Sequence, residues 1–121
     1  MKLTIVSILT VIAVWFALGS PGMASARELT VEEILCNCQN FITWRGHNIP
    51  SPLHQNTIKP GKPRVGSVAI WYWPQLGYGH VAEVILVSDT KFWTIGSNER
   101  GCGLFVTVTD LTDQAYQGWL E

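Results

Sequence analysis

Four short runs rich in valine, isoleucine and aromatic residues fill the second half of this 121-residue chain, and they constrain its fold more than any other feature. Runs of this kind, separated by proline, glycine, aspartate or asparagine, are typical of strands joined by turns. The runs are Ser67–Trp73, Val81–Ser88, Phe92–Ile95 and Leu104–Thr109. We expect them to form an antiparallel meander within a sheet of about four to six strands, with a short helix in the tail from Asp110 to Glu121.

A helical pattern precedes these runs. Thr30 and Glu33 have the spacing of a capping box, and apolar residues then recur at helical intervals over residues 31–44. Asn37 is also a favourable N-cap for a second helix that begins at Cys38, so one helix and two helices both fit the sequence. Because the helical part comes first and the strands follow, the predicted fold class is α+β.

The N-terminus has the features of an export signal. Lys2 supplies a positive start, residues 3–19 are mostly apolar, and Ala24-Ser25-Ala26 is a small-residue cleavage pattern. We expect a signal peptide over residues 1–26 and one domain over residues 27–121, which has 121 − 26 = 95 residues. An uncleaved membrane anchor is the alternative. Cleavage predicts a secreted or periplasmic bacterial protein that no longer contacts the membrane.

The charge of the expected mature chain argues against one class of partner. Removal of Lys2 with the signal leaves seven basic and nine acidic residues, a balance of −2. No run or cluster of lysine and arginine stands out, so we expect no nucleic-acid partner.

Three cysteines, Cys36, Cys38 and Cys102, belong to the expected mature chain. An odd number in an exported protein implies at least one free thiol or an intermolecular bridge. Cys36 and Cys38 are too close in sequence to pair without strain. A disulfide between Cys36 and Cys102 that leaves Cys38 free is the favoured arrangement, and three free thiols remain the alternative.

Cys38 and His80 are the candidate reactive pair. Cys38 opens a helical segment, and if a second helix begins at this residue, the helix dipole lowers the pKa of its thiol. His80 follows Gly79 at the start of an apolar strand-like run. A thiol and an imidazole on two rigid elements suit nucleophilic catalysis, as in papain-like enzymes. The competing interpretations are a small buried cysteine on an apolar helix face and a structural histidine.

The imidazole of His80 needs a partner that fixes its tautomer. Asn98 and Glu99 follow the next strand-like run, and either side chain is within plausible reach; for Asn98 the competing interpretation is a turn. Aromatic residues near His80 are candidates for lining a substrate groove, although packing in the core is their alternative role. These residues are Trp71, Trp73 and Tyr78.

Metal binding is the weaker interpretation. His47 and His54 lie in a proline-rich segment without a neighbouring set of ligands at the usual spacing. Cys36 and Cys38 have one residue between them, whereas zinc sites commonly have two or more. We therefore expect no metal and no cofactor, and we expect the two histidines to face solvent.

Three motifs in order resemble the CHAP family, the cysteine, histidine-dependent amidohydrolases/peptidases. They are Cys38-Gln39-Asn40-Phe41-Ile42, Gly66-Ser67-Val68-Ala69-Ile70-Trp71 and Gly79-His80-Val81-Ala82-Glu83-Val84. The segment Gly96-Ser97-Asn98-Glu99 is similar to the Gly-Gly-Asn-Gln of a compact subgroup, with serine in place of the second glycine. The resemblance extends from about residue 36 to residue 109 and implies a papain-like fold with the helix packed on the sheet.

The resemblance also implies residue roles and a substrate. Cys38 corresponds to the nucleophile, His80 to the general base and Asn98 to the residue that orients the imidazole; Glu99 is the alternative, because many members use glutamate. Cys36 is a possible rival for the nucleophile. The expected function is hydrolysis of amide bonds in peptidoglycan, with its peptides as the partner, by an amidase or endopeptidase. A catalytically inactive module that binds the cell wall or a protein is the alternative function.

Overall fold

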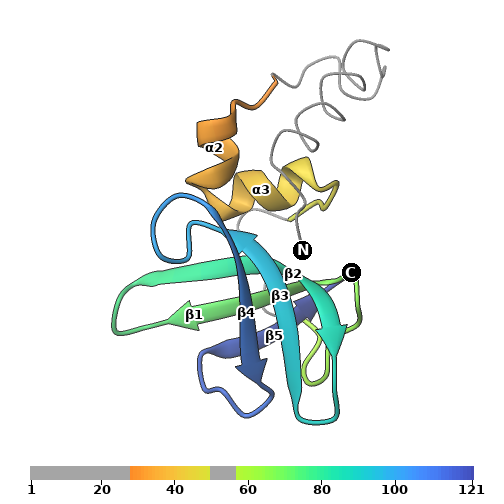
Figure 1. Ribbon diagram of the computed structural model, residues 1–121. Coiled ribbons are helices and arrows are strands. Elements are labelled where there is room, and N and C mark those ends of the chain that lie inside the picture. Colours follow the sequence, from red (N-terminus) through yellow and green to blue (C-terminus); the bar gives the residue numbers. More distant parts are fainter. Residues whose placement is uncertain (1–27, 50–56) are drawn as a thin grey trace. The chain divides into compact units, whose positions relative to one another are not determined.

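The computed structural model describes residues 28–49 and 57–121 (Figure 1). The predicted signal peptide and its cleavage site, and His54, lie outside these residues. The described residues from 32 to 121 belong to one compact unit. Within the described part of the chain, no helix has the length and apolar character needed to cross a membrane.

Over residues 28–49, the helical pattern forms two short helices and not one. α2 spans Val31–Leu35 and α3 spans Cys38–Trp44. Asn37 separates them in an extended conformation, and its side chain accepts a hydrogen bond of 3.0 Å from the peptide N–H of Asn40. This N-cap satisfies one of the free donors at the start of α3 and fixes the point at which that helix begins.

Five strands form one antiparallel sheet in the order β4-β3-β2-β1-β5. The strands are β1 Val68–Trp73, β2 Tyr78–Val87, β3 Lys91–Ser97, β4 Leu104–Asp110 and β5 Tyr116–Leu120. The first four make the predicted meander, and β5 returns to pair with β1. The α+β class is confirmed.

The prediction of a helix in the tail was wrong, because that segment forms β5. Trp119 and Leu120 are buried there, and Trp119 pairs with Ala69 of β1. Gly118 has a φ of 133°, a conformation that glycine reaches far more readily than other residues. Pairing with β1, which lies far away in the sequence, outweighs the weak local conformational preference of this short segment.

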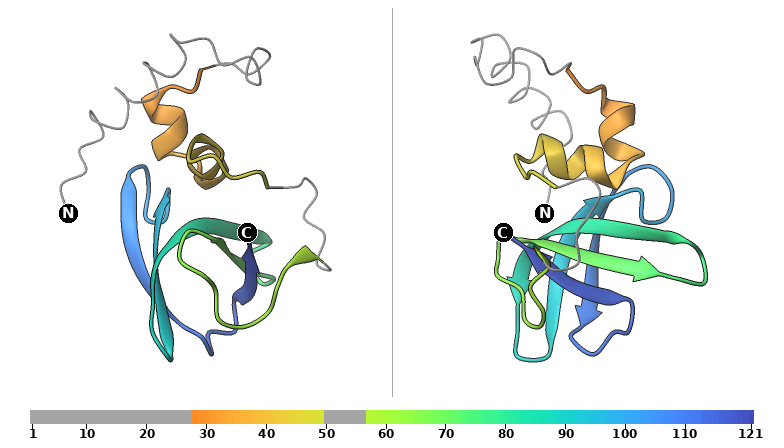
Figure 2. Two further views of the ribbon diagram at one scale, coloured as in Figure 1. Left: turned by 90° about the vertical axis from the view of Figure 1, so that its right-hand side faces the viewer. Right: turned by 180° about the vertical axis from the view of Figure 1, so that it is seen from behind.

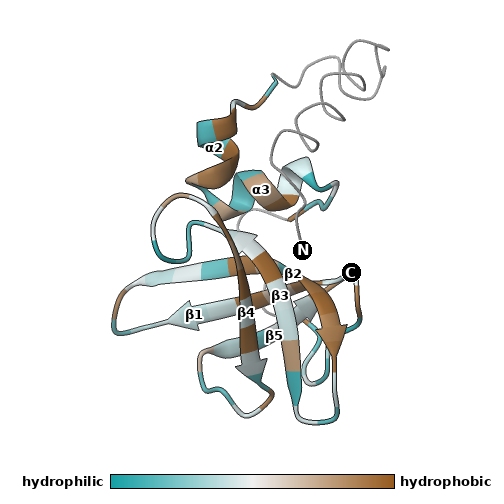
Figure 3. Ribbon diagram, in the orientation of Figure 1, coloured by the Kyte–Doolittle hydropathy of each residue, from teal (hydrophilic) through white to brown (hydrophobic). Residues whose placement is uncertain are grey.

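Apolar side chains of the sheet and of α3 form the core. Phe41 and Ile42 of α3 are almost fully buried, and α3 contacts β2 and β3 (Figures 1 and 2). β4 is also rich in apolar residues (Figure 3), but two of them, Val106 and Val108, are exposed and lie outside the core. A second group of buried side chains packs together within the sheet. Its members are Ala69, Trp71, Ala82, Val84 and Phe92.

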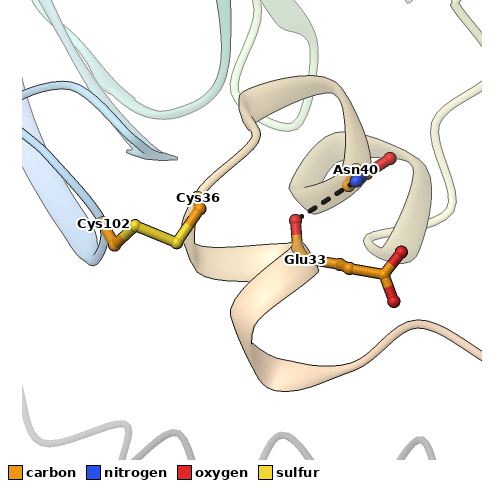
Figure 4. The surroundings of a disulfide bond; sticks show 4 residues. All are labelled: Glu33, Cys36, Asn40 and Cys102. Carbon is orange, nitrogen blue, oxygen red and sulfur yellow. Dashed lines mark hydrogen bonds between the residues drawn. A yellow bond between two sulfur atoms is a disulfide. The ribbon is translucent and has the colours of Figure 1, made fainter.

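A disulfide anchors the helical part to the sheet. It joins Cys36, between the two helices, to Cys102 in the loop between β3 and β4, 66 residues away (Figure 4). The peptide N–H of Gly103 donates to the carbonyl of Leu35 at 3.0 Å beside it. The arrangement favoured from the sequence is therefore the one present, and Cys38 is the free thiol.

A partly buried cluster of polar side chains holds the other end of α3. Arg45, the C-cap of α3, donates to both carboxylate oxygens of Glu83 on β2, at 3.2 and 3.0 Å. His47 Nε2 lies 2.8 Å from Glu83 Oε1, and its side chain is only 15% exposed. The expectation that His47 faces solvent was wrong, because the buried carboxylate of Glu83 requires partners that the sequence did not reveal.

Candidate active site

Cys38 is the first residue of α3 and lies beside His80 and Val81 of β2. Its thiol is partly buried and hydrogen-bonded to His80. The peptide N–H groups of Val81 and of Cys38 itself also donate to the sulfur. The N-cap at Asn37 therefore decides where the sulfur lies, because it sets the residue at which α3 begins.

His80 is the third residue of β2 and connects the thiol to a carboxylate. Its Nε2 donates to Glu99 Oε1 at 2.9 Å, which leaves Nδ1 as the nitrogen available to Cys38. The imidazole also contacts the ring of Trp71, with the centroids 5.5 Å apart. Because the side chains of His80 and Glu99 are only 12% and 11% exposed, water competes weakly for their hydrogen bond.

Glu99, and not Asn98, is the residue that contacts His80. The second carboxylate oxygen of Glu99 accepts a hydrogen bond from the hydroxyl of Thr107 on β4, so both oxygens are held. Asn98 is exposed, with a φ of 58°, and its peptide N–H donates to the carbonyl of Gly103 at 3.2 Å. The prediction that Asn98 orients the imidazole is therefore corrected: Asn98 makes the turn that brings Glu99 to the ring.

Gly96 allows this close approach of Glu99 and His80. A Cβ atom at residue 96 would lie 2.9 Å from the Cβ of Ala82, 3.2 Å from Glu99 Oε1 and 3.4 Å from His80 Nε2. Since neither the backbone nor the paired side chains can easily move away, a larger residue would displace the hydrogen bond. The sequence showed the glycine, but gave no sign of what approaches it.

The electrostatics of the pair favour a thiolate and an imidazolium. Burial raises the pKa of the Cys38 thiol, but the hydrogen bonds from His80 and from two peptide N–H groups, with the charge of His80, bring it below its usual value. Burial alone would lower the pKa of His80; hydrogen bonds and charges from Cys38 and Glu99 raise it to about 9. Each group therefore stabilises the charged form of the other.

A cleft of about 460 Å³ lies beside the two reactive groups. Trp71 lines it together with residues that the sequence analysis did not select: Gln39, Ile58, Ile70, Tyr72 and Gln117. Trp73 and Tyr78 do not line it, because they pair with each other beside the turn between β1 and β2. The prediction that Trp73 and Tyr78 line a groove near His80 was therefore wrong. Ile58 and Gln117 could not be predicted, because only the tertiary fold brings them to the cleft.

The remaining candidates for chemistry are accounted for by their contacts. Cys36 is bound in the disulfide and is not a rival nucleophile. Over residues 28–49 and 57–121, no group of three or more histidine, cysteine, aspartate and glutamate side chains is arranged to hold a metal ion. The site therefore consists of a thiol, an imidazole and a carboxylate, hydrogen-bonded in series beside a cleft. Groups in this order are suited to acyl transfer through a thioester.

Comparison with known proteins agrees with this chemistry. A family model described as the CHAP domain matches residues 12–98, which is more than half of the chain. No curated protein and no solved structure matches the chain significantly.

Proposed function

This chain belongs to the CHAP domain family, a family of peptidoglycan-related amidohydrolases and peptidases, and from that premise we propose that it hydrolyses amide bonds in peptidoglycan through Cys38, His80 and Glu99. One observation carries the proposal. The thiol, the imidazole and the carboxylate form a continuous hydrogen-bonded series at the edge of a cleft. Such a series activates a sulfur nucleophile and fixes the tautomer of its base.

In the first half of the reaction, the Cys38 thiolate attacks the carbonyl carbon of the bound amide. A tetrahedral intermediate forms, with its negative charge on the former carbonyl oxygen, which a peptide N–H near Cys38 stabilises. The imidazolium of His80 gives its proton to the amide nitrogen, the carbon–nitrogen bond breaks, and the amine leaves. The acyl group remains on the sulfur as a thioester.

In the second half, neutral His80 takes a proton from water, and the hydroxide attacks the thioester carbon. The carbon–sulfur bond breaks, the carboxylic acid is released, and the thiolate and imidazolium are restored. Glu99 keeps its hydrogen bond to Nε2 throughout, so Nδ1 points at the sulfur and the positive charge of the ring has a counter-charge. Glu99 is therefore a positioning residue.

We further propose that the protein acts outside the cytoplasm, where its substrate lies. The disulfide between Cys36 and Cys102 supports this location, because such bonds persist in oxidising compartments. The signal-like pattern of residues 1–26 supports it independently.

The proposal is tested by incubating the purified protein with isolated bacterial peptidoglycan and measuring loss of turbidity and release of new amino groups. We expect hydrolysis by the wild type and none by Cys38→Ala. Val106→Ala, at an exposed position on β4, is the matched control and retains activity. If the wild type binds the polymer but releases no amino groups, the inactive binding module is the correct description and the hydrolase proposal is wrong.

A further inference from the structure

A row of paired residues crosses the sheet at the cleft, and two of its members, Val81 and Ile70, line the cleft. Val81 of β2 lies opposite Ile70 of β1, and Ile70 lies opposite Gly118 of β5. The sulfur of Cys38 accepts a hydrogen bond from the peptide N–H of Val81, at one end of the row. Two strand spacings separate that end from Gly118, a distance of about 10 Å.

Ile58 occupies the other end of this row, above Gly118. A Cβ atom built on Gly118 would lie 2.7 Å from Ile58 Cγ2 and 2.3 Å from the carbonyl oxygen of Lys59. The side chain of Ile58 therefore rests where any larger residue at 118 would be. The missing side chain of Gly118 is what lets this segment approach the sheet.

Backbone hydrogen bonds fix Ile58 in that place. Lys59 and Trp119 form an isolated antiparallel bridge, with hydrogen bonds of 2.9 Å in both directions. The half-buried side chain of Ile58, one residue before this bridge, lines the cleft that contains Cys38 and His80. An apolar side chain with a fixed backbone therefore lies at the Gly118 end of the row, away from the end that contacts Cys38.

We propose that Ile58 is a specificity-determining residue: it closes the end of the cleft far from Cys38 and restricts the group bound there to small, uncharged side chains. This inference deepens the proposed function and rests on it. An extended peptide covers the span from Val81 to Gly118 in about three residues. Ile58 therefore selects the side chain within about three residues of the amide that Cys38 attacks.

The chemistry of the cleft explains the preference for uncharged groups. The described residues that line the cleft carry no carboxylate, ammonium or guanidinium group. A charged substrate side chain pressed against Ile58 and Ile70 would lose its water without gaining an ion-pair partner among these residues, which is unfavourable. A bulky side chain would have to displace Ile58, whose backbone the bridge to Trp119 holds.

The test uses the single free thiol as a probe of the space around it, so it does not depend on hydrolysis. The folded, unreduced protein is alkylated with iodoacetamide and with its N-biphenyl derivative, and the ratio of the two rate constants is measured. We expect Ile58→Ala to raise the ratio of large to small reagent about tenfold, the effect typical of methylene-sized changes in a pocket, and Ile58→Trp to lower it. A terminal carboxylate on the biphenyl group slows its reaction in the wild type.

Val65→Ala is the matched control, because Val65 is also β-branched but is 64% exposed and does not line the cleft. We expect Val65→Ala to give the same ratio of alkylation rate constants as the wild type. If Ile58→Ala, Ile58→Trp and Val65→Ala all give the wild-type ratio, Ile58 does not limit the cleft and the inference is wrong. Failure of the wild type to hydrolyse peptidoglycan would instead contradict the proposed function, and the alkylation ratios would separate the two outcomes.

Discussion

Asn98 and Glu99 are neighbours in the sequence, yet only Glu99 reaches the imidazole of His80. We expect Glu99→Gln to lower kcat for peptidoglycan hydrolysis by about 10²-fold or more, because general acid–base catalysis of that size depends on an oriented and charged ring. Asn98→Gly is the matched control, since glycine accepts the φ of 58° and leaves the turn intact. Steady-state kinetics of the two variants decide between the residues: a larger loss for Asn98→Gly would restore Asn98 as the orienting residue.

The raised pKa of His80 predicts the basic limb of the pH profile. Hydrolysis falls as the pH rises through about 9, because His80 then loses the proton that the departing amine requires. The lowered pKa of Cys38 predicts that iodoacetamide still alkylates this thiol at pH values below its ordinary pKa. Rates measured against pH test both statements. An alkylation profile identical to that of the unfolded chain would contradict the ion pair.

The raised pKa of His80 also makes the free energy of unfolding depend on pH. The pKa of His80 is raised from 6.5 to about 9 in the folded protein, so its contribution to the free energy of unfolding is fully present below 6.5 and disappears as the pH rises through about 9. We expect the urea midpoint of Glu99→Gln to depend less on pH across this window than that of the wild type. Parallel pH profiles for the two proteins would contradict this linkage.

At the residue scale, the sequence indicated Cys38 and His80 because each stands beside a recognisable local pattern. The third residue was not predictable in the same way. Which of two adjacent side chains faces the ring depends on the left-handed backbone of Asn98 and on the hydroxyl of Thr107, and both are set by the loop and by β4. Ile58 was missed for the same reason, since only its contact with Gly118 reveals it.

At the scale of elements, α3 is attached to the rest of the protein at both ends, which keeps Cys38 opposite His80. Glu83 holds the C-terminal end through Arg45 and His47. We expect Glu83→Gln to lower the free energy of unfolding by about 1–3 kcal/mol, because Arg45 loses its counter-charge and the buried site at residue 83 loses a hydrogen-bond acceptor. Urea denaturation with an unchanged m-value is the measurement.

A matched control for this prediction is Asp110→Asn. Asp110 also pairs with a cation, Lys91, but both side chains are about half exposed, at 57% and 47%. Loss of such a surface pair changes stability by less than about 1 kcal/mol. Equal effects of the two substitutions would show that the Glu83 cluster does not clamp α3.

Element prediction succeeded where the local pattern was strong. Periodicity and turn residues indicated the first four strands, and the N-cap at Asn37 indicated the possible break between α2 and α3. β5 escaped detection because it has only five residues and Gly118 interrupts them, although Tyr116 and Trp119 favour strands. Its backbone is ordered by pairing with β1, a contact between distant segments that local propensity does not report.

At the scale of the whole molecule, a small domain is closed by a covalent link between its first and second halves. Cys36 and Cys102 are 66 residues apart, and a disulfide that closes a loop of this size stabilises the folded state by about 4 kcal/mol in the chain-entropy description. We therefore expect the double variant Cys36→Ser, Cys102→Ser to unfold at much lower urea concentration than the wild type. Domains of this size bury a limited core, so the loss is a large part of their stability.

The double variant also separates the structural cysteines from the reactive one. Titration of unfolded, unreduced wild type with a thiol reagent should give one thiol per chain, and three after reduction, because the sequence contains three cysteines and one disulfide joins two of them. At temperatures where the double variant remains folded, alkylation of Cys38 should keep its wild-type pH dependence, since His80 and the peptide N–H of Val81 still contact the sulfur. Three thiols in the unreduced protein would exclude the disulfide. A normal thiol pKa in the folded double variant would mean that this bridge, and not the contact with His80, activates Cys38.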